Sequence, residues 1–288
     1  MAATEAGTVD AYLRPTELGE ALRALSTGPR VILAGGTDFY PALVGKPITG
    51  DVLDITGLAS LRGITQDGAG WRIGCLTTWS DLLVAPLPPY FDGLKQAARE
   101  VGGVQIQNAA TLCGNVCNAS PAADGVPNLM ALDAAVELSS VSGTRRLPLA
   151  EFVIGNRRTR RRPDELVTAI LIPKPVRPAR GRFLKLGARK YLVISIVMVA
   201  AVLEEAADDT VATARIAVGA CSAVACRLLA LEEALAGRRL DRHLGDAVRA
   251  AHLVPLDPID DVRASAAYRG DAAVTLLRRI LSDLGVGL

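Results

Sequence analysis

Small residues, side-chain amides, hydroxyls and one carboxylate are concentrated in residues 111–124, which read Thr-Leu-Cys-Gly-Asn-Val-Cys-Asn-Ala-Ser-Pro-Ala-Ala-Asp. Such a composition suits a backbone that approaches a large polar ligand closely and hydrogen-bonds it. The polar members alternate with apolar residues, which a solvated surface loop does not need. The segment is too polar and too rich in turn formers for a core helix, so we expect a ligand-binding loop. Its polar candidates are Asn115, Asn118, Ser120 and Asp124.

A second candidate loop, residues 33–38, follows the apolar run Val31 to Leu33 and reads Leu-Ala-Gly-Gly-Thr-Asp. Its glycines lack Cβ atoms, so consecutive N–H groups are exposed and can cradle a phosphate. The alternative is an ordinary turn after a short strand. The loop has neither Gly-x-Gly-x-x-Gly nor Gly-Lys-Ser/Thr, so a Rossmann dinucleotide site and a P-loop are not indicated. Together the two loops predict one extended cofactor held between two lobes.

The two loops resemble those of the FAD-binding, medium subunit of molybdenum hydroxylases, the family that includes xanthine dehydrogenase and carbon monoxide dehydrogenase. The patterns of that family are Ala-Gly-Gly-Thr-Asp and Thr-Ile-Gly-Gly-Asn-Ile-x-x-Ala-Ser-Pro-x-x-Asp. Further similarities follow in order in residues 152–173, in Phe-Leu-Lys-Leu-Gly-Ala-Arg at 183–189 and in Ser-Ala-Ala-Tyr-Arg at 265–269. Two positions depart from the pattern. Cys113 replaces the first glycine of the pair, and Gln107 stands where an arginine is common.

The resemblance implies which residues would bind FAD. The loop at 33–38 would hold the pyrophosphate through backbone N–H groups and the Thr37 hydroxyl, and residues 111–118 would contact the pyrophosphate and ribityl parts. Asp124 would accept hydrogen bonds from hydroxyls of the sugar region. Lys185 would lie near the ring system and stabilise negative charge on reduced flavin; the alternative is a surface lysine on a strand. Ile194 would pack on the isoalloxazine face. The implied cofactor-binding residues are Leu33, Ala34, Gly35, Gly36, Thr37, Asp38, Thr111, Gly114, Asn115, Asn118, Asp124 and Lys185.

The resemblance also implies an α+β fold. A FAD-binding domain similar to that of vanillyl-alcohol oxidase would occupy residues 1–176, in two lobes at about 1–57 and 58–176. A smaller α+β C-terminal domain, residues 177–288, would contain an antiparallel sheet and helices.

The implied activity is electron transfer by one oxidoreductase subunit of a heterotrimer. A large partner subunit would carry the molybdenum cofactor, and a small partner subunit would carry [2Fe–2S] clusters that reduce the FAD. NAD, a quinone, oxygen or another acceptor would then receive the electrons. Neither a catalytic residue nor a metal site is expected on this chain.

Two other functions stay open. A stand-alone FAD-dependent oxidase or dehydrogenase would bind an organic substrate in its own pocket and require a general base near the flavin, and no candidate base is identified. A flavin-free assembly protein of the same fold is favoured only by Cys113. It is opposed by the retained glycine and polar positions, Gly35, Gly36, Gly114, Asn115 and Asp124.

The composition fits an intracellular globular subunit. A chain of 288 residues can bury a substantial core in two or three lobes. Apolar residues make up 50% but aromatic residues only 4%, so the core is built mainly from Ala, Val, Leu and Ile. The net charge of +2 is too balanced to imply a nucleic acid or an anionic membrane as partner. We expect a cytoplasmic protein, because a signal-peptide pattern is missing and the longest apolar run, residues 191–203, falls short of the roughly 20 residues of a membrane helix.

The cysteines and histidines predict no metal centre. The five cysteines lack both Cys-x-x-Cys and ferredoxin spacing, and are expected to be buried or incidental thiols. His243 and His252 do not share a helical face, and are expected to be surface or packing residues. The one basic cluster is either a solvated loop or a docking surface for an acidic partner subunit or a phosphate-bearing acceptor. It comprises Arg157, Arg158, Arg160, Arg161 and Arg162.

Hydrophobic periodicity and breaker residues predict the order of elements. A helix at 16–26, strands at 31–33 and 52–55 and a short helical turn between them form a small βα lobe. Strands follow at 71–75, 136–141 and 166–172, with helices at 78–84 (capped by Thr78), 91–101 and 127–132. After a boundary in the proline-rich stretch 173–178, strands at 195–203 and 211–218 precede helices at 223–236, 241–252 and 266–284.

Overall fold

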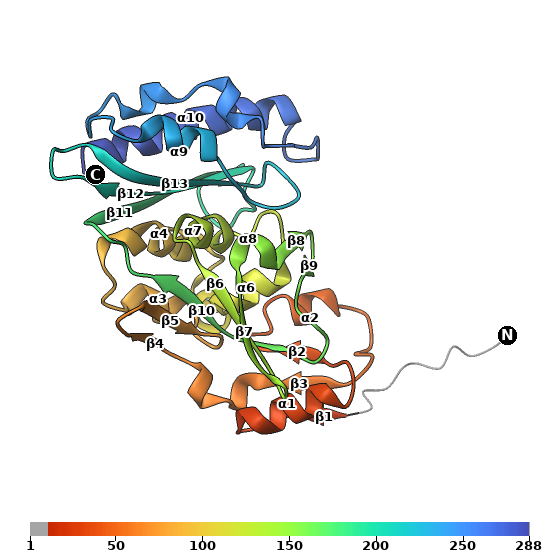
Figure 1. Ribbon diagram of the computed structural model, residues 1–288. Coiled ribbons are helices and arrows are strands. Elements are labelled where there is room, and N and C mark those ends of the chain that lie inside the picture. The colour runs from red at the N-terminus through yellow and green to blue at the C-terminus, as the bar shows by residue number, and fades with distance from the viewer. Residues whose placement is uncertain (1–10, 288) are drawn as a thin grey trace.

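The computed structural model describes residues 11–287, which form three stacked layers (Figure 1). The first layer is a parallel sheet in the order β1 (Tyr12–Leu13), β3 (Val52–Asp54) and β2 (Val31–Leu33). Helix α1 (Leu18–Ser26) packs its buried Ala21, Leu22 and Leu25 into the core, and α2 (Phe39–Ala42) follows β2. The helix, the two strands and the short helical turn predicted for this part of the chain are therefore confirmed.

The middle layer is built on a five-stranded antiparallel sheet. Its strand order is β4 (Ile64–Gln66), β5 (Gly70–Gly74), β10 (Leu166–Pro173), β6 (Ala135–Ser140) and β7 (Gly143–Pro148). The helices of this layer are α3 (Trp79–Val84), α4 (Asp92–Glu100), α5 (Val104–Ala109), α6 (Leu112–Asn118), α7 (Gly125–Ala131) and α8 (Leu149–Phe152). A small hairpin of β8 (Val153–Gly155) and β9 (Arg158–Thr159) follows α8. Thr78 caps α3 as predicted, because its Oγ1 accepts the Asp81 N–H at 3.1 Å.

The third layer is an antiparallel sheet of β11 (Ala179–Leu186), β12 (Val197–Glu205), β13 (Val211–Gly219) and β14 (Cys226–Arg227). Helices α9 (Leu229–Leu235) and α10 (Ala266–Gly285) cover one face, while α4 and α7 of the middle layer cover the other (Figure 1). Along β12, alternate residues such as Val197 and Met198 enter two different hydrophobic clusters. A strand buried on both faces reads as one continuous apolar run, which explains the buried strand predicted here.

Three predicted elements differ from the structure. Residues 112–118 are helical rather than a loop, because Leu112, Cys113 and Val116 form a buried stripe on α6. The helix predicted at 223–236 is only α9, since β14 pairs with β13 just before it. The helix predicted at 241–252 is replaced by 3₁₀ turns at 244–247 and 250–253. Gly245 there lies so close to α10 that a Cβ would meet the Arg278 carbonyl, which shows that packing against α10 sets the local path.

The proline-rich stretch lies between the middle sheet and the third layer. Strand β10 ends at Pro173, and β11 begins at Ala179. Among residues 11–287, the helices are all too short or too polar to cross a lipid bilayer.

Candidate functional site

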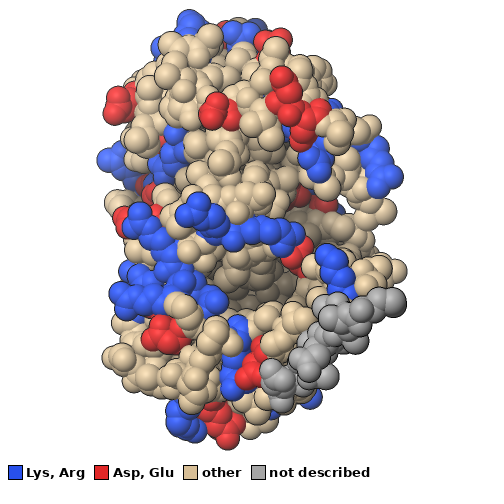
Figure 2. Space-filling view, turned by 90° about the vertical axis from the view of Figure 1, so that its right-hand side faces the viewer, with Lys and Arg blue, Asp and Glu red and all other residues tan. Residues whose placement is uncertain are grey.

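A cavity of about 590 Å³ lies between the first layer and the middle layer. The loop after β2 lines one side, and residues from Ala110 to Asn118 line the other. Apolar side chains such as Ile55 and Trp79 also line the cavity. The space-filling view shows a hollow on this side of the molecule, with lysine and arginine side chains gathered beside it (Figure 2). A lining of polar and apolar groups and a volume of this size are typical of cofactor pockets.

The loop at 34–38 presents its backbone to the cavity. Among the described residues, the N–H groups of 35–38 donate no hydrogen bond to the protein. Gly36 has φ +72°, and a Cβ there would lie 2.6 Å from the ring of Tyr40. At Gly35 a Cβ would overlap the carbonyl oxygen of Ala109, so this glycine allows the two lobes to meet. The loop therefore offers consecutive free donors, as a phosphate cradle requires.

The opposite wall is α6 with the residue that caps it. Thr111 accepts the N–H of Gly114 at 2.9 Å through its hydroxyl. Asn115 holds the start of α7, because its Oδ1 accepts the Gly125 N–H at 3.2 Å. At the other end of α6, Oδ1 of Asn118 accepts a hydrogen bond from Arg157 at 2.9 Å. These contacts fix the wall but leave polar atoms along the cavity.

The structure brings together most of the predicted cofactor residues. Leu33, the last residue of β2, is 5% exposed and is not part of the cavity lining. Asp124 and Lys185 also lie outside the lining of this cavity. The predicted residues that line it are Ala34, Gly35, Gly36, Thr37, Asp38, Thr111, Gly114, Asn115 and Asn118.

Asp124 and Lys185 form a buried ion pair. Nζ of Lys185 lies 2.8 Å from Oδ2 of Asp124 and 3.3 Å from the carbonyl oxygen of Val193. The hydroxyl of Ser195 donates to Oδ1 of Asp124 at 2.6 Å. Oε2 of Glu100 lies 4.0 Å from the same ammonium group. Since its side chain is only 4% exposed, Lys185 is not a surface lysine.

Burial dominates the electrostatics of this cluster. It raises the pKa of Asp124 above its usual value, and the charge of Lys185 and the hydrogen bonds from Lys185 and Ser195 act in the opposite direction. Burial likewise raises the pKa of Glu100, while Lys185 lowers it. Of the two carboxylates, that of Asp124 is the nearer to the Lys185 ammonium group and is therefore its main counter-ion.

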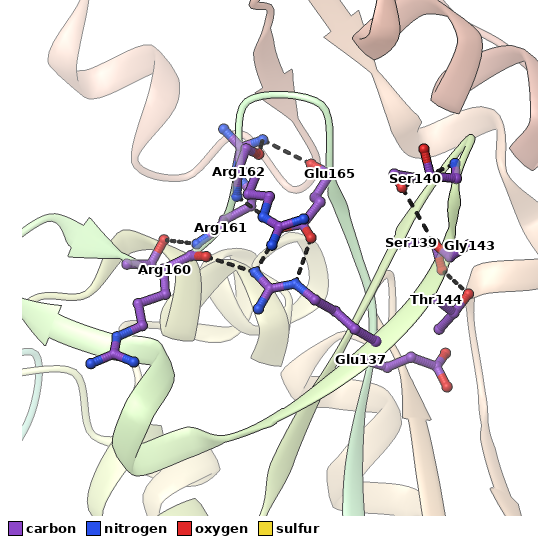
Figure 3. Close-up of polar contacts among 12 residues, drawn as sticks. Glu137, Ser139, Ser140, Gly143, Thr144, Arg160, Arg161, Arg162 and Glu165 are labelled. Atoms are coloured by element: carbon purple, nitrogen blue, oxygen red, sulfur yellow. Dashed lines mark hydrogen bonds and ion pairs between the residues drawn. The ribbon is translucent and has the colours of Figure 1, made fainter.

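Arg157 and Arg161 connect the basic segment to the cavity. Arg157 donates to Oδ2 of Asp38 at 3.0 Å and to Asn118, and so joins the two walls at the protein surface. Arg161 lines the cavity, and its Nη1 donates to the Glu165 carbonyl at 2.8 Å (Figure 3). The sequence analysis found these arginines as a cluster but did not assign them to the cofactor site. The concentration of arginines between residues 157 and 162 was the only signal in the sequence.

The rest of the arginine segment is divided between structural and exposed roles. Arg145 pairs with Glu165 at 2.6 Å. The same carboxylate accepts the N–H of Arg162 at 2.8 Å (Figure 3). The Arg145 interaction is the principal reason that the pKa of Glu165 is lowered. Arg158 and Arg160 are exposed, and their guanidinium groups contact no described residue at hydrogen-bonding distance.

The two departures from the family pattern occupy defined places. The side chain of Cys113 is 3% exposed and lines the cavity. Gln107 is buried and donates from Nε2 to the carbonyl of Arg99 at 3.2 Å. Cys75 also lines the cavity, where burial raises the pKa of its thiol to about 12. Within 11–287, no group of three or more His, Cys, Asp or Glu side chains is arranged to bind a metal ion.

The donors present fit FAD. Free N–H groups beside a glycine that adopts positive φ suit a pyrophosphate, and the apolar walls suit the uncharged parts of a flavin nucleotide. Cys113 reduces the space by one side chain but removes none of the donors.

Comparisons with known proteins assign the family. Residues 5–175 match the family described as the FAD binding domain in molybdopterin dehydrogenase, and residues 182–284 match the CO dehydrogenase flavoprotein C-terminal domain. The nicotinate dehydrogenase FAD-subunit of Eubacterium barkeri is 35% identical over 65% of this chain and 66% of that protein. A putative xanthine dehydrogenase FAD-binding subunit of Escherichia coli is 30% identical over 94% of each chain.

A solved structure agrees with these matches. A chain of reconstituted CO dehydrogenase from Oligotropha carboxidovorans superposes with a TM-score of 0.90 at 26% identity, covering 99% of this chain and 100% of that one. The α+β fold with antiparallel sheets is thereby confirmed. The chain therefore belongs to the family of FAD-binding medium subunits of molybdenum hydroxylases, and it is an oxidoreductase subunit.

Proposed function

We propose that this chain binds FAD in the cavity between its first two layers and transfers electrons through it. The observation that carries the proposal is the row of free N–H groups at residues 35–38, which faces the polar wall of α6 across the cavity. FAD supplies the redox chemistry when bound. The protein supplies the binding groups, the orientation of the ring system and the exclusion of water.

Each wall has its own part in binding. The loop at 34–38 holds the pyrophosphate through its N–H groups and the Thr37 hydroxyl. Thr111, Gly114, Asn115 and Asn118 contact the pyrophosphate and ribityl parts from α6. Arg161 adds a positive charge to the same cavity. Anion binding by several fixed donors is stronger than binding by any one of them.

Asp124, which precedes α7 of the middle layer, and Lys185, on β11 of the third layer, act on the flavin together. The Asp124 carboxylate has acceptor capacity beyond its bonds to Lys185 and Ser195, because a carboxylate offers about four lone-pair sites. That capacity serves hydroxyls of the FAD sugar region. The ammonium group of Lys185 stabilises negative charge on the ring system. Residues 1–176 are assigned to the FAD-binding domain and 177–288 to the C-terminal domain, which supplies Lys185.

The partners are a large subunit with a molybdenum cofactor and a small subunit with [2Fe–2S] clusters, from which the flavin receives electrons. The names of relatives support this, since one is the medium chain of carbon monoxide dehydrogenase from Hydrogenophaga pseudoflava. The five cysteines of this chain do not supply the thiolates that two such clusters need. NAD, a quinone or oxygen is the acceptor.

The visible absorption spectrum of the purified chain tests this proposal, with the flavin released by denaturation and identified. Stoichiometric FAD is the expected result. Reduction of that FAD by a purified [2Fe–2S] partner subunit then tests the direction of electron flow. A colourless chain that binds no added FAD would overturn the proposal and favour an assembly protein. Oxidation of an organic substrate by the chain alone would favour a stand-alone enzyme.

A further inference from the structure

Arg269 is a buried cation in the C-terminal domain that the cofactor site described above does not use. It lies in the first turns of α10, within the C-terminal Ser-Ala-Ala-Tyr-Arg segment, and is 3% exposed. Ser265 caps this helix, since its hydroxyl accepts the Tyr268 N–H at 3.2 Å. A charged side chain is seldom buried this deeply unless its partners are fixed.

The guanidinium of Arg269 holds three acceptors from three segments. Nη1 donates to the carbonyl oxygens of Ile196 at 2.6 Å and Ala220 at 3.0 Å. Nη2 donates to Oδ1 of Asp261 at 2.8 Å. Ile196 immediately precedes β12, and Ala220 immediately follows β13. The planar fork therefore ties together two neighbouring strand ends in a fixed geometry, which the compact ammonium group of a lysine would hold less rigidly.

Both of these strand ends are hydrogen-bonded to the segment that contains Asp124. Ser195, next to Ile196, donates its hydroxyl to Oδ1 of Asp124 at 2.6 Å. The N–H of Ala220 donates to the carbonyl of Pro121 at 3.0 Å, and Ala220 has the unusual φ of +62°. Arg269 thus reaches the turn at residues 120–124 by two separate routes, one through Ser195 and one through Ala220.

We propose that Arg269 is a positioning residue for the flavin site: it fixes the two strand ends that hold the 120–124 turn, and so orients the Asp124 carboxylate. This inference rests on the proposed role of Asp124 in binding FAD. The reason is geometric. A carboxylate that must accept hydrogen bonds at fixed angles depends on the groups that hold it, and small displacements of such groups weaken binding.

A double-mutant cycle on the full-length chain separates positioning from a general loss of stability. The FAD dissociation constant is measured by quenching of flavin fluorescence during titration of the apoprotein, in Arg269→Met, Asp124→Ala and the double variant. Arg279→Met is the matched control, because Arg279 is exposed on the same helix and contacts no described residue at hydrogen-bonding distance. The thermal midpoint of each apoprotein is measured in parallel.

We expect Arg269→Met to raise the dissociation constant about tenfold, and Arg279→Met to change it less than twofold. In the Asp124→Ala background, Arg269→Met should have little further effect, because the carboxylate that it orients is gone. Arg269→Lys should recover part of the affinity, since it keeps the charge but not the fork. Should Arg269→Met fail to fold, Arg269→Lys takes its place in the cycle with a smaller expected effect.

The outcomes distinguish this inference from the proposed function. An equal loss of affinity on changing Arg269 in both backgrounds would show that the residue acts independently of Asp124, and overturns the inference alone. Unchanged affinity in Arg269→Met overturns it as well. Unchanged affinity in Asp124→Ala overturns the proposed role of Asp124 in FAD binding, and this inference with it.

Discussion

The ammonium group of Lys185, on β11, lies 2.8 Å from Oδ2 of Asp124, the residue that immediately precedes α7. Both side chains are more than nine-tenths buried. The pair therefore links the C-terminal sheet to the segment that carries the family pattern. Removal of one member of a buried pair leaves the other charge without its counter-ion, which costs about 3–5 kcal/mol.

We expect Lys185→Met to lower the free energy of unfolding at neutral pH by about 3 kcal/mol or more. The double variant Lys185→Met/Asp124→Asn should lose less than the single variant, because it has no uncompensated carboxylate. Urea denaturation of the apoproteins measures both. Equal losses in the single and double variants would show that the ion pair is not what Lys185 contributes.

The loss of unfolding free energy in Lys185→Met should also depend on pH. Burial raises the pKa of Asp124, and without Lys185 the pKa rises further. A carboxyl whose folded-state pKa is raised contributes most favourably below its unfolded pKa, and this contribution is lost as the pH rises through the folded pKa. The deficit of Lys185→Met relative to the unaltered chain should therefore be small near pH 4 and grow toward pH 8. A deficit that is constant with pH would contradict this assignment.

Two glycines with the same backbone conformation allow a matched test of the phosphate cradle. Gly36 and Gly45 both have φ +72°, but only Gly36 lines the cavity, and a Cβ at Gly45 would meet nothing within 4 Å. Alanine at either position carries a left-handed strain of about 1–2 kcal/mol. We expect both variants to lose stability through this strain, with a further loss in Gly36→Ala because the exposed Tyr40 ring must shift. Only Gly36→Ala should lose FAD affinity, by tenfold or more. Retention of full FAD occupancy by Gly36→Ala would contradict the assignment of this loop to FAD binding.

The sequence predicted the glycine loop at 33–38 and the cap of α3 because both depend on local chemistry. Glycines that free backbone N–H groups, and a threonine such as Thr78 that caps a helix, can be read residue by residue. The helical conformation of residues 112–118 could not, because it depends on burial of Leu112 and Val116 against other segments. In that setting, tertiary packing overrides the weak helix propensity of Gly114 and Asn115.

The buried network around Asp124 shows the same limit over longer range. Ser195 is 71 positions from Asp124 along the chain, and its role appears only when β12 is placed beside α7. Lys185 was predicted from the resemblance alone, with a surface position as the alternative. Strand β7, with its polar and largely exposed pattern, lacked the alternation that identifies a half-buried strand.

Arg157 should matter more for cofactor retention than for folding. It is 61% exposed and joins Asp38 on one wall to Asn118 on the other. Exposed ion pairs contribute about 0–1 kcal/mol to stability. The free energy of unfolding of Arg157→Met should therefore be close to that of the unaltered chain. We expect its FAD dissociation rate to rise severalfold at low salt, because the two walls are no longer joined. Stopped-flow transfer of FAD to an excess of apoflavoprotein measures that rate.

Arg158→Met is the control for Arg157→Met, because Arg158 is the exposed neighbour and its guanidinium contacts no described residue at hydrogen-bonding distance. The difference between the two variants should shrink at high ionic strength, where exposed charges are screened. Identical rates in both variants at low salt would mean that the Arg157 bridge has no part in retaining the cofactor.

Asp261 should give the C-terminal domain a distinct acid sensitivity. The N–H of Arg263, followed by the guanidinium of Arg269, lowers the pKa of this carboxyl from 3.8 to about 2. A carboxyl with a depressed folded-state pKa contributes stability above its unfolded pKa, and the contribution is lost as the pH falls through the folded value. In the unaltered chain, the urea midpoint should therefore fall between pH 4 and pH 2, and part of that fall should be missing in Asp261→Asn. Asp257→Asn, which changes an exposed carboxylate with no described partner, should show the full fall in urea midpoint.

If Asp261→Asn also shows the full fall in urea midpoint, the carboxylate of Asp261 does not anchor Arg269 through its charge.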